Sequence, residues 1–122
     1  MISFKVEDLS DMNASLKEFV DLLESENVDA DCVFDSHLIA CELISNVLKH
    51  CKEAAHFCGY LTGEEVVISV HGESSVGVIP APTLPEALAE SGRGLYIINA
   101  VSGGNVTVQG NEVKVIIKRK QL

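Results

Sequence analysis

The sequence predicts an α/β protein of the two-layer α+β type, with helices on one face of a mixed, mainly antiparallel sheet. Three observations predict this class. Residues 12–23 repeat apolar side chains at helical spacing, residues 66–70 form a β-branched run typical of a strand, and residues 106–117 contain two strand patterns around a tight turn. Helical patterns dominate the first half and strand patterns the second, which suits helices that cover one face of a sheet.

The N-terminal quarter predicts a strand followed by a helix. Residues 2–6 alternate in the manner of an opening strand. Ser10 or Asp11 is a suitable N-cap for the helix, because its side-chain oxygen can accept a hydrogen bond from a free backbone N–H. The apolar residues of this helix recur three and four positions apart; they are Met12, Leu16, Phe19, Val20 and Leu23.

A second and longer helix is expected after a polar break at residues 24–31. Asp35 or Ser36 is its expected N-cap, and the pattern runs to about His56. This helix is apolar around most of its circumference, so we expect it to be largely buried.

The second half of the chain predicts strands separated by a loop and a helix. Residues 66–70 read as a buried strand, and three prolines between positions 80 and 85 predict a loop. Residues 95–101 then show a helical pattern. The last two strands, 106–109 and 112–117, flank Gly110 and Asn111, which favour a tight hairpin turn.

Length, composition and charge narrow the class of protein. The 122 residues suit a single domain over positions 1–122, and 47% apolar with 22% charged residues is typical of a folded chain. A net charge of −9 argues against a nucleic-acid partner, because phosphate backbones are bound mainly by clustered Lys and Arg. No apolar run reaches the roughly 20 residues of a membrane helix, and the N-terminus lacks a leader pattern, so we expect a cytoplasmic protein.

The four cysteines lie in the first half of the chain and form no C-x-x-C pair. Free thiols in a reducing compartment are therefore expected. The alternative is a zinc site built on His37 and Cys41, four residues apart, although structural zinc sites usually show tightly paired ligand spacings. Its further ligands would be Cys51, His56 and Cys58.

Polar residues of the second helix form one stripe. Glu42, Asn46 and His50 are each four residues apart, so successive side chains are offset by about 40° and stacked about 6 Å along the axis. A carboxylate can orient or deprotonate a nucleophile, and an amide oxygen can bind Mg²⁺. The alternative is the solvated stripe of any amphipathic helix.

A second candidate feature is Gly92-Arg93-Gly94-Leu95, which follows the proline loop and opens a helix. Glycine lets the backbone approach a ligand closely, and free N–H groups at the start of a helix attract phosphate. The alternative is an ordinary turn and cap, for which glycine is also common.

These two features, in this order, resemble the GHKL ATPase family. Residues 42–50 are similar to its N-box, E-x-x-x-N-x-x-x-H, and residues 90–98 are similar to the glycine box of the anti-sigma-factor serine/threonine kinases, in which G-R-G-L opens a helix. The resemblance covers nearly the whole chain and implies the Bergerat ATP-binding fold.

The resemblance implies roles for individual residues. Glu42 would be the general base, Asn46 the Mg²⁺ ligand, and Arg93 a catalytic residue that stabilises phosphate charge. The implied nucleotide-binding residues are Asn46, His50, Glu73, Gly77, Gly92, Arg93, Gly94 and Leu95. It further implies ATP and Mg²⁺ as cofactors, a sigma factor or an anti-sigma-factor antagonist protein as partner, and a homodimer.

One box departs from the family pattern. In the family, D-x-G-x-G follows a strand, and its aspartate accepts a hydrogen bond from the adenine amino group. Aligned on Gly77, this chain has Glu73 at the aspartate and Ser75 at the first glycine. Glutamate keeps the acceptor but is longer by one methylene. The alternative function is therefore a non-catalytic module of the same fold that binds a regulatory protein without using ATP.

Overall fold

The computed structural model describes residues 1–73, 105–109 and 112–120, which form two helices, one π-helical turn and five strands. In chain order these are β1 (Ile2–Val6), α1 (Leu9–Ser25), α2 (Ala30–Asn46), the π-helical turn η1 (Val47–Cys51), β2 (Ala55–Leu61), β3 (Glu65–His71), β4 (Val106–Gln109) and β5 (Glu112–Lys118).

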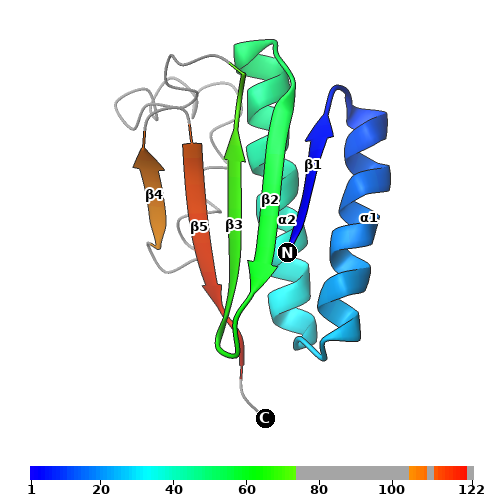
Figure 1. The fold of residues 1–122 in the computed structure, drawn as a ribbon, viewed down its shortest axis with the longest axis vertical. Helices are drawn as coiled ribbons and strands as arrows, with labels where there is room; N and C mark the ends of the chain where they lie inside the picture. The colour runs from blue at the N-terminus through cyan, green and yellow to red at the C-terminus, as the bar shows by residue number, and fades with distance from the viewer. Residues whose placement is uncertain (74–104, 110–111, 121–122) are drawn as a thin grey trace.

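The five strands form one sheet in the order β1-β2-β3-β5-β4, and the two helices pack on one of its faces (Figure 1). The predicted two-layer arrangement of helices on a sheet is thus confirmed, as are the strand within β3 and the pairing of β4 with β5. The predicted turn at Gly110 and Asn111 lies outside the described residues. The sheet was expected to be mixed, but every pairing among the described strands is antiparallel.

Both helices begin earlier than the sequence predicts. Asp8, not Ser10 or Asp11, caps α1: its Oδ1 accepts a hydrogen bond from the N–H of Asp11 at 2.8 Å. Asp29 caps α2 in the same way, accepting from the N–H of Cys32 at 3.0 Å. The prediction of Asp35 or Ser36 as the cap of α2 is wrong because both lie within the helix.

The end of the second helix was also predicted wrongly. Instead of running to His56, α2 ends at Asn46, passes through η1, and is followed by β2. The alternation in β2 is hard to detect because two of the positions that face the helices are Ala55 and Gly59, neither of which signals a strand. One interior strand of the sheet, β2, was therefore not predicted from the sequence.

Aromatic rings fill the layer between helices and sheet at β2. The ring of Phe57 stacks on Phe4 of β1 at a centroid distance of 4.6 Å and meets Phe19 of α1 edge-on at 5.0 Å. Phe19 has no exposed surface. A Cβ added to Gly59 would lie 2.6 Å from Cε1 of Phe19, so glycine is required here by the packing of the rings.

We therefore expect Gly59→Ala to destabilise the protein by about 1–3 kcal/mol, the usual range for overpacking a core. Gly63→Ala is the matched control, because a Cβ at Gly63 meets no atom within 4 Å. Urea unfolding of both variants tests this. Equal stabilities of the two variants would show that the ring of Phe19 moves aside at little energetic cost.

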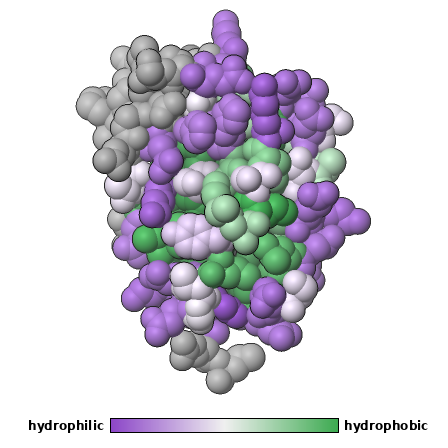
Figure 2. Space-filling view, viewed as in Figure 1, coloured by the Kyte–Doolittle hydropathy of each residue, from purple (hydrophilic) through white to green (hydrophobic). Residues whose placement is uncertain are grey.

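The other face of the sheet is not covered by either helix, and we call it the open face. Tyr60, Val67 and Ile116 are direct cross-strand neighbours there. Val67 is only 3% exposed although it is not part of the core cluster between the layers. In Figure 2, which looks onto the open face, apolar surface gathers near its centre within a polar surround.

Candidate functional site

The predicted polar stripe begins in the last turns of α2. Glu42 is partly exposed, whereas Asn46, the final residue of the helix, is 2% exposed. Their neighbours Leu43, Ile44 and Val47 belong to the core and fix this part of the helix against the sheet. The structure thus gives Asn46 a fixed position one turn beyond the Glu42 carboxylate.

The α-helix changes to a π-helical turn immediately after Asn46. Such turns are rare and occur frequently at functional sites. His50 lies in this turn, so the α-helical spacing that relates Glu42 to Asn46 does not extend to it, and its side chain is outside the described part of the structure. Lys52 ends the turn with a left-handed backbone, φ 52°.

The end of α2 meets the end of β3 at the upper edge of the molecule in Figure 1. A cavity of about 460 Å³ opens at this edge. Its lining comes from the ends of β1 and β3 and from η1 and the residues after it; the lining residues are Lys5, Glu7, Leu48, Lys52, Glu53, Ala54 and Glu73. The cavity therefore joins the segment after α2 to the region of Glu73, and its walls carry both charge signs.

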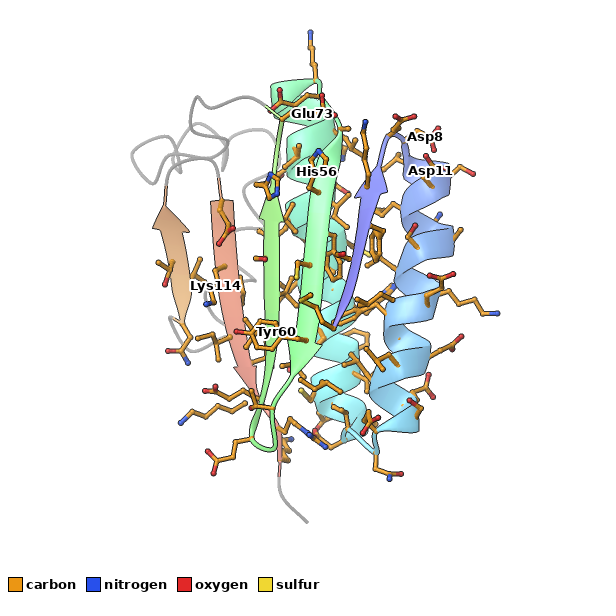
Figure 3. The ribbon with its side chains drawn as sticks, viewed as in Figure 1. Asp8, Asp11, His56, Tyr60, Glu73 and Lys114 are labelled. Carbon is orange, nitrogen blue, oxygen red and sulfur yellow. The ribbon has the colours of Figure 1, made fainter. Side chains whose placement is uncertain are left out.

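Glu73 is part of an ion-pair cluster on the open face. Its Oε1 lies 3.2 Å from Nζ of Lys5 and 3.6 Å from Nε2 of His56. Lys5 and His56 are cross-strand partners, and they alternate with Phe4 and Phe57, which face the helices. Figure 3 shows Glu73 beside His56 at the end of the sheet. The Glu73 carboxylate is thus turned toward the face of the sheet opposite Asn46.

The stacked rings of His56 and His71 extend this cluster, with centroids 4.8 Å apart and an interplanar angle of 8°. Nδ1 of His71 lies 2.8 Å from the carbonyl oxygen of Gly72. Sequence reasoning missed these neighbours because it placed His56 in a helix. The alternation of β2 and its register with β3 are the only signals that bring the two histidines together.

Lys5 lowers the pKa of the Glu73 carboxyl, first through its hydrogen bond and then through its charge. The lowered pKa means that the ion pair supports folding above the ordinary pKa of glutamate and is lost as the pH falls through the lowered value. In an NMR titration, Glu73 should titrate below an ordinary glutamate, and Lys5→Met should raise its pKa. Lys114→Met, on the same face but away from Glu73 (Figure 3), should leave it unchanged. A Glu73 pKa insensitive to Lys5→Met would contradict the contact.

The remaining predicted site residues lie outside the described part of the structure. They are Gly77, Gly92, Arg93, Gly94 and Leu95, together with the predicted proline loop and the helix after it. The phosphate cradle at Gly92–Leu95 therefore stays a prediction. So does the place of Ser75 in the altered box.

The oxygen donors of Glu42 and Asn46 suit a hard cation such as Mg²⁺. Mg²⁺ usually takes only one or two protein ligands and completes its shell with water and nucleotide phosphates. Within the described residues, no group of three His, Cys, Asp or Glu side chains is arranged to hold a metal ion. A magnesium ion at α2 would thus depend on the amide of Asn46 together with phosphate oxygens.

The described residues of the alternative zinc site are divided between α2 and the sheet, and the side chain of Cys51 lies outside the described part of the structure. Sγ of Cys41 lies 3.8 Å from Nε2 of His37 on α2, whereas His56 and Cys58 lie on the open face of the sheet. Burial raises the pKa values of the Cys32 and Cys41 thiols, which disfavours the thiolate form that binds metals. Cys32, Cys41 and Cys58 are free cysteines.

Two comparisons with known proteins bear on identity. No known family model matches the chain, and no curated protein matches it in sequence. Neither described helix has the length and apolar character needed to cross a membrane.

Proposed function

We propose that this protein binds Mg²⁺-ATP at the end of α2 and acts as a serine/threonine protein kinase of the anti-sigma-factor type. Its fold would be the Bergerat ATP-binding fold. The observation that carries the proposal is the buried Asn46, one helical turn after Glu42 and directly before a π-helical turn. A buried amide at a distorted helix end is unusual unless a structural or functional need retains it.

The proposed roles follow from chemistry. Asn46 would hold Mg²⁺ through its amide oxygen, and the backbone of Gly92 and Gly94 with the Arg93 guanidinium would hold the phosphates. Mg²⁺, when bound, neutralises phosphate charge. Glu42 is partly exposed at the helix surface, where its carboxylate can accept the proton of an incoming serine or threonine hydroxyl. Phosphoryl transfer depends mainly on such positioning and charge neutralisation.

The proposed partners are a sigma factor and a small antagonist protein that receives the phosphate. This arrangement suits a cytoplasmic regulator that works by exchanging protein partners. The strongly acidic chain, with a net charge of −9, supports protein rather than nucleic-acid partners. A homodimer is part of the same proposal and rests on the family resemblance alone.

A second candidate function is a partner-binding module of the same fold that does not use ATP. The contacts of Glu73 favour this second function. The Glu73 carboxylate pairs with Lys5 and His56, so it would have to leave both before it could accept a hydrogen bond from adenine. Loss of one charge-assisted hydrogen bond weakens binding by about 1.5–3 kcal/mol.

Thermal unfolding in the presence of nucleotide separates the two functions. A ligand that binds only the folded state at one hundred times its Kd stabilises it by about 2.7 kcal/mol. We expect Mg²⁺-ATP to raise the Tm, and EDTA to remove most of this shift. An unchanged Tm at millimolar Mg²⁺-ATP would reject the kinase and favour the module.

A further inference from the structure

The negative charge of this protein is concentrated on its helical layer. Residues 9–46, which contain α1 and α2, hold nine of the eighteen Asp and Glu residues but only one of the nine Lys and Arg residues. This segment therefore has a net charge of −8 out of −9. Lys120, after β5, forms an ion pair with Asp31 and offsets one of these charges. The sheet and the rest of the chain are nearly neutral.

A groove of about 780 Å³ runs between α1 and α2 on this acidic layer. Its apolar lining consists of Val20, Val28, Ala30, Val33 and Phe34. Phe34 is 68% exposed, the largest exposure of any aromatic side chain among the described residues. Aromatic side chains that stand exposed beside an apolar groove are typical anchors of protein interfaces.

The rim of the groove is polar and carries both charge signs, within a helical layer whose net charge is −8. Glu24 and Asp29 contribute carboxylates, and Lys17 contributes one positive charge. The carboxylate of Asp29 also accepts hydrogen bonds from the N–H groups of Cys32 and Lys120. An apolar floor with carboxylates around it matches a partner that has apolar side chains flanked by Lys and Arg.

The length of the groove suits a helix. Its lining on α1 extends from Asn13 to Glu24, about three helical turns or roughly 16 Å. An amphipathic helix places anchors at i, i+3, i+4 and i+7 over about 10 Å, so this set of anchors fits within the groove. Phe34 is twelve residues before Asn46 on the same helix, about 18 Å away, so the groove is separate from the proposed nucleotide site.

We propose that the groove between α1 and α2 binds a basic amphipathic helix of a partner protein, with Phe34 as the central anchor. A second copy of this chain placed helical layer against helical layer does not fit, because the two layers each carry a net charge of −8. The proposal goes beyond the proposed kinase function and holds whether or not ATP is bound.

Synthetic peptides test the proposal. The probe is a fluorescein-labelled 18-residue peptide with leucines at i, i+3, i+4 and i+7 and lysines on its polar face. One control peptide has the same composition in scrambled order, and another has glutamate in place of lysine. By fluorescence anisotropy we expect the probe to bind and both controls to bind at least tenfold more weakly, a factor that corresponds to about 1.4 kcal/mol.

Two protein variants locate the binding surface. Phe34→Ala is expected to weaken binding of the probe at least tenfold. Leu9→Ala is the matched control, because Leu9 is also exposed, at 50%, but does not line the groove; it should change binding less than twofold. Phe34 is exposed, so its replacement should leave the Tm unchanged, and circular dichroism checks this.

Several results would overturn the proposal. If the probe and its scrambled control bind equally well, the binding comes from charge attraction alone. If the Phe34→Ala variant binds the probe as tightly as wild type, the peptide site lies elsewhere. If wild type sediments as a dimer and Phe34→Ala sediments as a monomer, the groove is occupied by a second copy of this chain. The peptide titration is repeated in the presence of Mg²⁺-ATP. We expect the same affinity for the probe, because the groove is separate from the proposed nucleotide site.

Discussion

Glu42→Gln is expected to reduce phosphate transfer by about 10²–10⁴-fold while leaving the affinity for Mg²⁺-ATP nearly unchanged. The amide of glutamine keeps the shape of the side chain but cannot accept the proton of the hydroxyl nucleophile. Since Glu42 is partly exposed on the surface of α2, the substitution should not disturb the core. The rate of ADP formation in the presence of the acceptor protein is the measurement.

The control for this prediction is Glu18→Gln, which removes an exposed carboxylate from α1, the other helix, away from the groove. It should leave the rate of ADP formation at the wild-type value. If Glu42→Gln and wild type release ADP equally fast, Glu42 is not the base. If Glu42→Gln instead loses nucleotide binding with its fold intact, the carboxylate serves the binding of nucleotide and not proton transfer.

Phe19→Ala is expected to destabilise the protein by about 3–5 kcal/mol, the usual loss when a buried phenylalanine leaves a cavity. Phe19 is fully buried on α1, and its ring meets Phe57 edge-on and lies over Gly59. This loss is a large part of the 5–15 kcal/mol by which domains are usually stable. Urea denaturation of wild type and variant measures it.

The pair Phe19 and Gly59 provides a sharper form of this prediction. In the Phe19→Ala background, the ring that an added Cβ at Gly59 would strike is gone, so Gly59→Ala should lose most of its effect. We expect a coupling free energy of about 1–3 kcal/mol in the double-mutant cycle. Additive effects would contradict the close approach of 2.6 Å between this ring and the added Cβ.

Strong periodicity decided which elements could be predicted from the sequence. The apolar residues of α1 lie on one face at i, i+4, i+7 and i+11, and Met12, Leu16, Phe19 and Leu23 are indeed buried. The β-branched run of β3 was equally clear. By contrast, α2 has Ser36 buried with no exposed surface, so its first turns read as polar, and the cap was placed too late.

Strand β2 shows why a central element can be missed. It was assigned in part to a helix because Ala55 and Gly59 stand at positions that usually hold large β-branched residues. The reason lies elsewhere in the chain, in the ring of Phe19 on α1. A constraint imposed by a residue forty positions away leaves no local pattern in the strand itself.

The candidate site, like the fold, could be predicted only where its residues lie close together in one helix. Spacing alone related Glu42 to Asn46, since both lie in one α-helix. It could not reveal that the Glu73 carboxylate contacts Lys5 and His56, because that cluster depends on the antiparallel register of β1 and β2 and on the end of β3. Pairing across strands is set by the whole sheet and not by local sequence.

The central claim is that Asn46 belongs to a Mg²⁺-dependent nucleotide site, and calorimetric titration tests it most directly. ATP and ADP would be titrated with and without Mg²⁺ into wild type, Asn46→Ala and the control Ser45→Ala, each shown to be folded by its unfolding transition. We predict micromolar, Mg²⁺-dependent ATP binding to wild type and to Ser45→Ala, and loss of the Mg²⁺-dependent part in Asn46→Ala. No binding to folded wild type at millimolar nucleotide would contradict the claim.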